Sequence, residues 1–216
     1  MCAATPGAVW AIGDFSDFGP RDAVSKALQR LEASGNIRRI DRGLYDRPRV
    51  NRLTGKPTVP DYRAVIEAVA RRDRARILVD GMTAANDLGL SDAVPGSVVV
   101  RSDGRIKPLH LDNLTITFRP TSTNKLFWAG RPAMRLVQAL HWLKPKIHEP
   151  MEGPRLRRRI EALLSDPQKG AVLREDLKAG LATLPIWMQD FLNGLHFQHP
   201  KLSKSTKTQS AKKRRK

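Results

Sequence analysis

The sequence is poor in the features that mark disulfide-linked, membrane and secreted proteins. Its one cysteine, Cys2, excludes an internal disulfide and is typical of a reducing compartment. No run approaches the ~20 apolar residues that a membrane-spanning helix needs. The N-terminus also lacks the basic start and apolar stretch of a signal peptide. We therefore expect a cytoplasmic protein without membrane contact.

Candidate catalytic and metal-binding residues are also few. His196 and His199 are three residues apart, but no cysteine or carboxylate cluster completes a zinc site. Asp80 follows an apolar run, as a strand-end carboxylate would, yet no glycine-rich phosphate loop ending in Lys-Ser/Thr accompanies it. We expect no enzymatic activity, no cofactor and no metal. An enzyme acting on nucleic acid would need a cluster that forms only in three dimensions.

Acidic residues are in short supply, at 21 against 39 lysines and arginines, which gives a formal net charge of +18. This excess indicates a polyanionic partner, with nucleic acid the first candidate. Residues 201–216 hold eight of the positive charges and no acidic residue, and their KKRRK end could add phosphate contacts or only solubilise the chain. The arginines of residues 155–159 lie on a helix with an apolar opposite face. They are interpreted as a solvated surface, with a DNA-backbone or partner-protein surface as the alternative.

Residues 20–48 carry the most informative local pattern. Pro20 suits the start of a helix, and the apolar residues that follow recur on one face at helical spacing. Gly35 then stands where a left-handed cap ends a helix. Ile37 and Ile40 are strand-like apolar positions, and an Asp-Arg-Gly turn at 41–43 precedes Leu44 and Tyr45, which predicts a β-hairpin.

A helix, a cap and a basic hairpin in this order form the latter half of a winged helix-turn-helix, which lays a helix in the DNA major groove. A short strand at 9–12 and a short helix at 14–18 fit the part before it. Such a domain normally has another helix earlier, and residues 1–8 are too few to supply it. We therefore expect the domain to lack its usual first helix. Either it is trimmed, or a partner chain or the rest of the protein covers the exposed side.

The polar residues of this helix and hairpin are the candidate DNA contacts. Arginine can bond guanine and glutamine can bond adenine, while lysine and serine suit phosphates. The helix face alone would be interpreted as an ordinary solvated surface, but the adjoining hairpin arginines favour DNA. Arg42, at the turn, is the best placed for a minor-groove or phosphate contact, whereas Arg30 could instead pair with Asp22 or Glu32. The candidate residues are Arg21, Ser25, Lys26, Gln29, Arg30, Arg38, Arg39 and Arg42.

The fold class expected for the whole chain is α+β. The winged helix-turn-helix occupies residues 1–50, and the proline- and glycine-containing residues 51–60 form a linker. Residues 61–198 form a mixed α/β domain with a helical C-terminal part, and residues 199–216 form a disordered Lys/Arg-rich tail with almost nothing to bury. Strands are expected at 77–79, 97–101, 114–119 and 125–128, a short helix capped by Thr83 at 83–88, and a longer helix at 133–143.

Several short motifs resemble a known family. They are Trp10, Asp14-Phe15, the run at 27–31, Gly-Asn-Ile-Arg-Arg at 35–39, and Arg-Gly-Leu-Tyr at 42–45 followed by Pro48. Together they resemble the winged helix of AbiEi-type antitoxins from bacterial type IV toxin–antitoxin systems. Residues 62–143 are similar to the second domain of that group, above all over residues 80–90. The resemblance covers about two-thirds of the chain.

The resemblance implies a DNA-binding repressor of its own operon. Such an antitoxin counters a nucleotidyltransferase-like toxin without forming a stable complex with it. The partner is then double-stranded operator DNA, bound through the candidate residues above, and a homo-oligomer on DNA is open. Two alternatives stay open as well: a protein-interaction module, and a solitary DNA-binding regulator without a cognate toxin.

Overall fold

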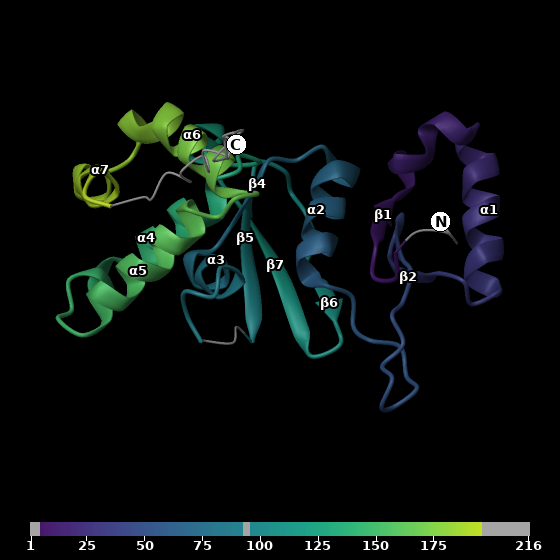
Figure 1. The fold of residues 1–216 in the computed structure, drawn as a ribbon. Helices are drawn as coiled ribbons and strands as arrows, with labels where there is room; N and C mark the ends of the chain where they lie inside the picture. Colours follow the sequence, from purple (N-terminus) through teal and green to yellow (C-terminus); the bar gives the residue numbers. More distant parts are fainter. Residues whose placement is uncertain (1–4, 93–95, 196–216) are drawn as a thin grey trace, which may run out of the picture.

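The computed structural model describes residues 5–92 and 96–195, which form a mixed α+β fold (Figure 1). The predicted disordered tail and its KKRRK end lie outside the described residues. The first part contains β1 (Val9–Ala11), the 3-10 helix η1 (Ile12–Phe18), α1 (Arg21–Ala33), β2 (Arg38–Asp41) and β3 (Leu44–Asp46). The second contains α2 (Tyr62–Asp73), β4 (Ile77–Val79), α3 (Gly81–Asp87), β5 (Ser97–Ser102), β6 (Leu109–Leu111), β7 (Leu114–Pro120), η2 (Thr123–Leu126), α4 (Met134–Ile147), α5 (Glu152–Leu164), α6 (Gly170–Gly180), η3 (Leu181–Thr183) and α7 (Ile186–Asn193).

The N-terminal unit, residues 5–50, is built on a three-stranded antiparallel sheet in the order β1-β3-β2. Successive side chains of a strand point to opposite faces. Tyr45 therefore turns toward α1, where it forms a small core with Val24, Leu28 and Ile37. Gly35 has a φ of 71° and follows α1, as the sequence predicted.

The other face of this sheet is covered by α2. Val9, Ala11 and Leu44 are buried in the same hydrophobic cluster as Val65 and other apolar residues of α2. In Figure 1, α2 lies between the two sheets. The rest of the protein therefore covers the face of the first sheet that is opposite α1.

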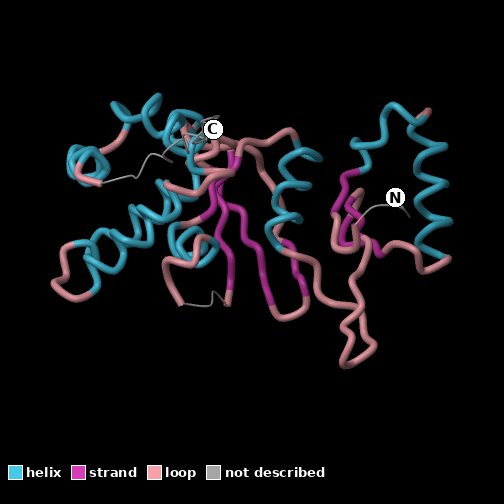
Figure 2. The backbone as a smooth tube through the Cα atoms, viewed as in Figure 1, coloured by secondary structure: helices cyan, strands magenta, loops and turns pink. Residues whose placement is uncertain are grey.

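Two ion pairs fasten the end of α2 to the N-terminal unit. Arg71 pairs with Asp14 at 3.0 Å, and Arg72 pairs with Asp41 at 2.7 Å. Burial alone would raise the pKa of Asp14, but the hydrogen bonds from Arg71 and the Ala11 N–H, with the charge of Arg71, hold it below its ordinary value. The connection between β3 and α2 is a projecting loop, closed by a bridge between Val50 and Pro57 (Figure 2).

The C-terminal unit, residues 61–195, contains a four-stranded sheet in the order β4-β5-β7-β6. Its central pair, β5 and β7, is parallel, and the two outer pairs are antiparallel. Helices α3 and α4 pack closely, since a Cβ on Gly81 would lie 2.6 Å from the Gln138 carbonyl oxygen. The chain then ends in helices, where Ile160, Leu164 and Met188 are fully buried. None of the described helices is long and apolar enough to cross a membrane.

Three local predictions were wrong. The predicted strand at 125–128 is instead the end of the 3-10 helix η2 and the turn that follows it. Leu126 and Trp128 are buried and Phe127 is not, so these residues reproduce the alternation of a strand. The short helix begins at Gly81 because Asp80, and not Thr83, accepts the capping hydrogen bond. Helix α4 continues through Pro145 to Ile147, which is tolerated because only the last turn loses a hydrogen bond.

Candidate nucleic-acid interface

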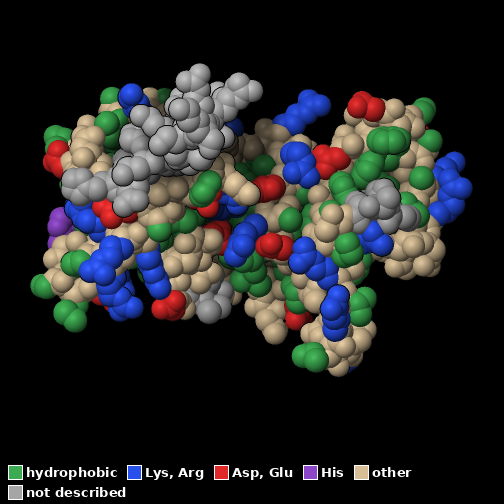
Figure 3. All heavy atoms as spheres, in the orientation of Figure 1, with side chains coloured by type: hydrophobic (Ala, Val, Ile, Leu, Met, Phe, Trp, Pro, Cys, Tyr) green, Lys and Arg blue, Asp and Glu red, His purple; other side chains and the backbone are tan. Residues whose placement is uncertain are grey.

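A cleft of about 740 Å³ lies where both units meet, and we call it the basic cleft. It is lined by α1, the β2–β3 turn, the end of α2 and the loop between β5 and β6. Lysine and arginine side chains are scattered over the face in Figure 3, so surface charge alone does not mark a site. The basic cleft is distinguished by its lining. The cationic residues are Arg21, Arg39, Arg42, Arg72, Arg105 and Lys107, and the carboxylates are Asp41 and Asp73.

Helix α1 contributes three residues spaced by four. Arg21, Ser25 and Gln29 therefore form one stripe along the helix and all line the cleft. Val24 and Leu28, on the adjacent face, are buried against the sheet and fix the rotation of the helix. The stripe thus presents a guanidinium, a hydroxyl and an amide to one space.

The β2–β3 hairpin contributes Arg39 and Arg42. Its turn depends on Gly43, whose φ of 70° lies in the region that favours glycine. The turn is held in place because the Ile12 N–H donates to the Gly43 carbonyl at 2.9 Å. Both arginines are exposed, so they are free to contact a ligand in the cleft.

Arg72 pairs with both carboxylates of the cleft. It lies 2.7 Å from Asp41 and 2.8 Å from Asp73, and it also donates to the Arg42 carbonyl at 3.0 Å. Burial would raise the pKa of Asp41, but the hydrogen bonds from Arg72 and the Arg42 N–H, with the nearby positive charges, lower it. Asp41 therefore stays ionised at neutral pH, and the cleft remains cationic because its six lysine and arginine residues outnumber its two carboxylates.

Four cations of the cleft have no internal counter-charge. Arg21, Arg42, Arg105 and Lys107 make no ion pair with any residue within 5–92 and 96–195. Arg39 donates only to the Asp41 backbone carbonyl, at 3.4 Å. The basic cleft is therefore electrostatically suited to a polyanion.

The structure brings five of the eight predicted residues together in the basic cleft, namely Arg21, Ser25, Gln29, Arg39 and Arg42. Lys26 and Arg30 form a different exposed stripe of α1, and Arg30 donates to the Lys26 carbonyl at 3.3 Å. They do not line the cleft.

Arg38 is also placed away from the cleft. It forms a two-pronged bond to Asp46, at 3.0 and 2.6 Å, and donates to the Thr58 carbonyl at 3.0 Å. Asp46 is only 1% exposed, so its carboxylate is shielded from water, while the Arg38 side chain remains 35% exposed. Arg38 thus joins the hairpin to the connecting loop and has its charge neutralised there.

Sequence reasoning missed Arg72, Arg105 and Lys107. Arg72 lies at the end of α2, and nothing local in the sequence places it beside the hairpin. The segment Arg105-Ile106-Lys107 does carry a weak signal, because an apolar residue between two cations after a glycine turn is typical of an anchored basic loop. Its distance of some sixty residues from the hairpin in sequence hid the connection.

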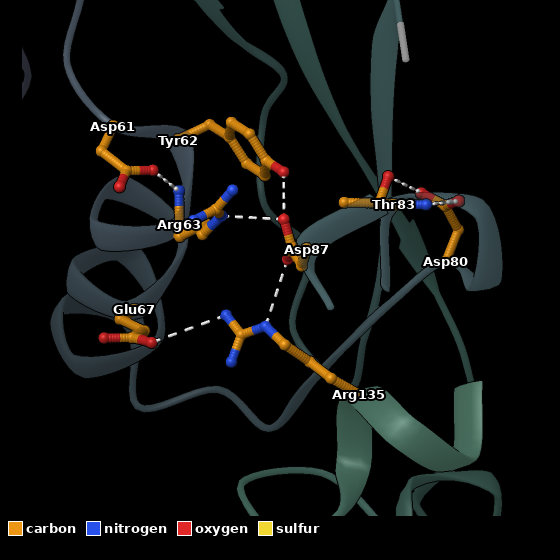
Figure 4. A network of polar contacts seen from close by, with 8 residues as sticks. All are labelled: Asp61, Tyr62, Arg63, Glu67, Asp80, Thr83, Asp87 and Arg135. Atoms are coloured by element: carbon orange, nitrogen blue, oxygen red, sulfur yellow. Dashed lines mark hydrogen bonds and ion pairs between the residues drawn. The ribbon is translucent and has the colours of Figure 1, made fainter. Parts of the chain in front are cut away.

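A second polar cluster surrounds Asp87 in the C-terminal unit (Figure 4). The Asp87 carboxylate accepts hydrogen bonds from the Tyr62 hydroxyl, from Arg63 at 2.8 Å and from Arg135 at 3.2 Å. Burial, followed by the bond to Asp87, raises the pKa of Tyr62. These groups satisfy one another and tie α2, α3 and α4 together. Within the described residues, no group of three or more His, Cys, Asp or Glu side chains could hold a metal ion.

The architecture and the cleft together define an α+β protein with a cationic cleft between its two units. The chain belongs to a family of unknown function (DUF6088), whose sequence profile matches residues 1–168. The match includes every element that lines the basic cleft and ends before α6 and α7. No curated protein matches the chain.

Proposed function

We propose that this protein is a double-stranded-DNA-binding regulator that contacts its site through the basic cleft. The observation that carries the proposal is the stripe Arg21, Ser25 and Gln29 facing Arg39 and Arg42 across one cleft. A helix followed by an antiparallel hairpin is the arrangement of a winged helix, in which the helix enters the major groove and the hairpin contacts the neighbouring backbone or minor groove. The α1 helix takes the first role here and the β2–β3 hairpin the second.

In this proposal some side chains of the cleft contact base edges and others contact phosphates. Gln29 and Arg21 carry the donors and acceptors that distinguish adenine and guanine edges. Ser25, Arg39 and Arg42 contact phosphates and set the position of the helix on the duplex. Arg38, Lys26 and Arg30 have no part in reading, because they lie outside the cleft.

The biological role that we propose is that of a cytoplasmic autorepressor and antitoxin. This part rests on the resemblance to AbiEi-type antitoxins, and DNA binding does not depend on it. Co-expression with a nucleotidyltransferase-like protein encoded beside the gene tests it. Rescue of growth supports the antitoxin, whereas toxicity unchanged by co-expression leaves a solitary regulator.

Single substitutions in the cleft distinguish the phosphate contacts, which position the helix on the duplex, from the base contacts, which determine sequence specificity. We expect Arg42→Ala to weaken binding to all duplexes by about tenfold, since one phosphate contact is worth roughly 0.9 in the log–log salt slope. We expect Gln29→Ala to reduce discrimination at one base pair, by about 1–3 kcal/mol. The measurement is a gel-shift titration at fixed salt, with a duplex that the wild-type protein selects from a randomised pool and with its single-base variants.

Lys26→Ala provides the matched control, because Lys26 is an exposed residue of the same helix outside the cleft. It is expected to change affinity by less than about twofold. Unchanged affinity and specificity in both cleft variants would contradict the proposed function, as would an equal loss in the control.

A further inference from the structure

The loop between β5 and β6, residues 103–108, brings two cations of the C-terminal unit to the basic cleft. Arg105 and Lys107 are exposed, while Ile106 between them is half-buried and packs against the main hydrophobic core. The apolar residue therefore anchors the segment, and its two neighbours stay on the outside. This alternation places both charges on the cleft side of one short segment.

The loop is fixed at both ends. The Arg76 N–H donates to Asp103 at 2.8 Å, and the Gly104 N–H donates to the fully buried Ser102 hydroxyl at 3.0 Å. Leu109, which begins β6, is buried as well. The backbone of this segment is thus positioned before any ligand binds, which lowers the entropic cost of ordering it on binding.

Neither cation has a counter-charge among the described residues. Arg105 and Lys107 have no ion pair with the part of the chain that the structure describes, and the two carboxylates that line the cleft, Asp41 and Asp73, pair with Arg72. Uncompensated cations on three separate elements line one open space. A ligand with regularly repeated negative charges can pair with the cations of all three elements at once, whereas a single small anion cannot.

We propose that Arg105 and Lys107 bind the phosphodiester backbone of the same duplex that α1 and the hairpin contact. The C-terminal unit is then part of the DNA interface, and α2 holds the two contact surfaces in a fixed relation through its pairs with Asp14 and Asp41. This inference rests on the proposed function and adds a backbone contact beyond the reach of the N-terminal unit.

The test is the salt dependence of binding by the full chain. The probe is a fluorescein-labelled 30-base-pair duplex of mixed sequence, followed by anisotropy between 50 and 300 mM salt. Removal of two phosphate contacts in Arg105→Ala/Lys107→Ala is expected to reduce the log–log slope by about 1.8, which corresponds to about 60-fold in affinity at 0.1 M salt. The matched control, Arg155→Ala/Arg158→Ala, removes the same charge from exposed positions on α5 and is expected to change the slope by less than about 0.5.

The outcomes separate this inference from the proposed function. Binding that is weakened by Arg42→Ala but unchanged in the loop variant contradicts the inference alone. An equal loss in the loop variant and the α5 control also overturns it, because net charge then explains both results. A wild-type protein without duplex affinity contradicts the inference and the proposed function together. Both loop residues are exposed, and unchanged circular dichroism confirms that the variant folds.

Discussion

Replacement of Arg39 and Arg42 by glutamate together is expected to lower the affinity for duplex DNA by at least ~100-fold at 0.1 M salt. Loss of two phosphate contacts alone accounts for about 60-fold through counterion release. The two new carboxylates add repulsion from the phosphates, and Arg72 has no further capacity to neutralise them because it already pairs with Asp41 and Asp73. Anisotropy titration of the selected duplex measures the effect.

The control for this reversal has the same net charge as the reversed cleft variant. Arg155→Glu/Arg158→Glu changes the net charge by the same amount on α5, away from the cleft. It is expected to lower affinity by less than about fivefold. A loss of similar size in both variants would mean that the chain attracts DNA by its total charge, and the basic cleft would have no special role.

The second large effect concerns stability. Asp87→Ala is expected to reduce the free energy of unfolding by about 2–4 kcal/mol, measured by urea denaturation. The Asp87 side chain is 2% exposed, and its removal leaves Arg63, Arg135 and Tyr62 without their shared acceptor. The value lies below that for a fully buried pair because the Arg63 and Arg135 side chains are 46% and 27% exposed, and water can reach them.

Two further variants serve as a partial removal of the cluster and as a surface control. Tyr62→Phe removes one donor and keeps the carboxylate, so a smaller loss of about 1 kcal/mol is expected. Asp190→Ala, at an exposed position on α7, is expected to stay within about 0.5 kcal/mol of the wild type. A stability of Asp87→Ala equal to that of the wild type would show that the cluster in Figure 4 does not hold α2, α3 and α4 together.

Much of the fold was predictable because its signals are local. The amphipathic stripe of α1, the glycine at 35 and the hairpin around Gly43 are set by residues close in sequence, and the structure confirms all three. Strand β6 was not predicted, because three residues become a strand only through pairing with β7. The mixed α+β class followed from the same local patterns, whereas the cover that α2 gives to the first sheet depends on tertiary packing.

The candidate site shows the same division. The sequence shows which residues of α1 are polar, but tertiary packing determines which of them face the cleft. Arg21, Ser25 and Gln29, which line it, could therefore not be distinguished in the sequence from Lys26 and Arg30, which do not. Adjacent strand residues point to opposite faces, and sequence alone did not show that Arg39 faces the cleft while Arg38 faces Asp46. The loop cations join the cleft only because the two units pack together.

Hydrogen–deuterium exchange of the full chain, with and without the selected duplex, tests the central claim most directly. DNA binding through the basic cleft is expected to slow amide exchange in α1, in the β2–β3 hairpin and in residues 103–108, with α5 and α7 unchanged. Protection confined to α5, α6 or α7, or absent from both α1 and the hairpin while the duplex is bound, would contradict the assignment of DNA binding to the basic cleft.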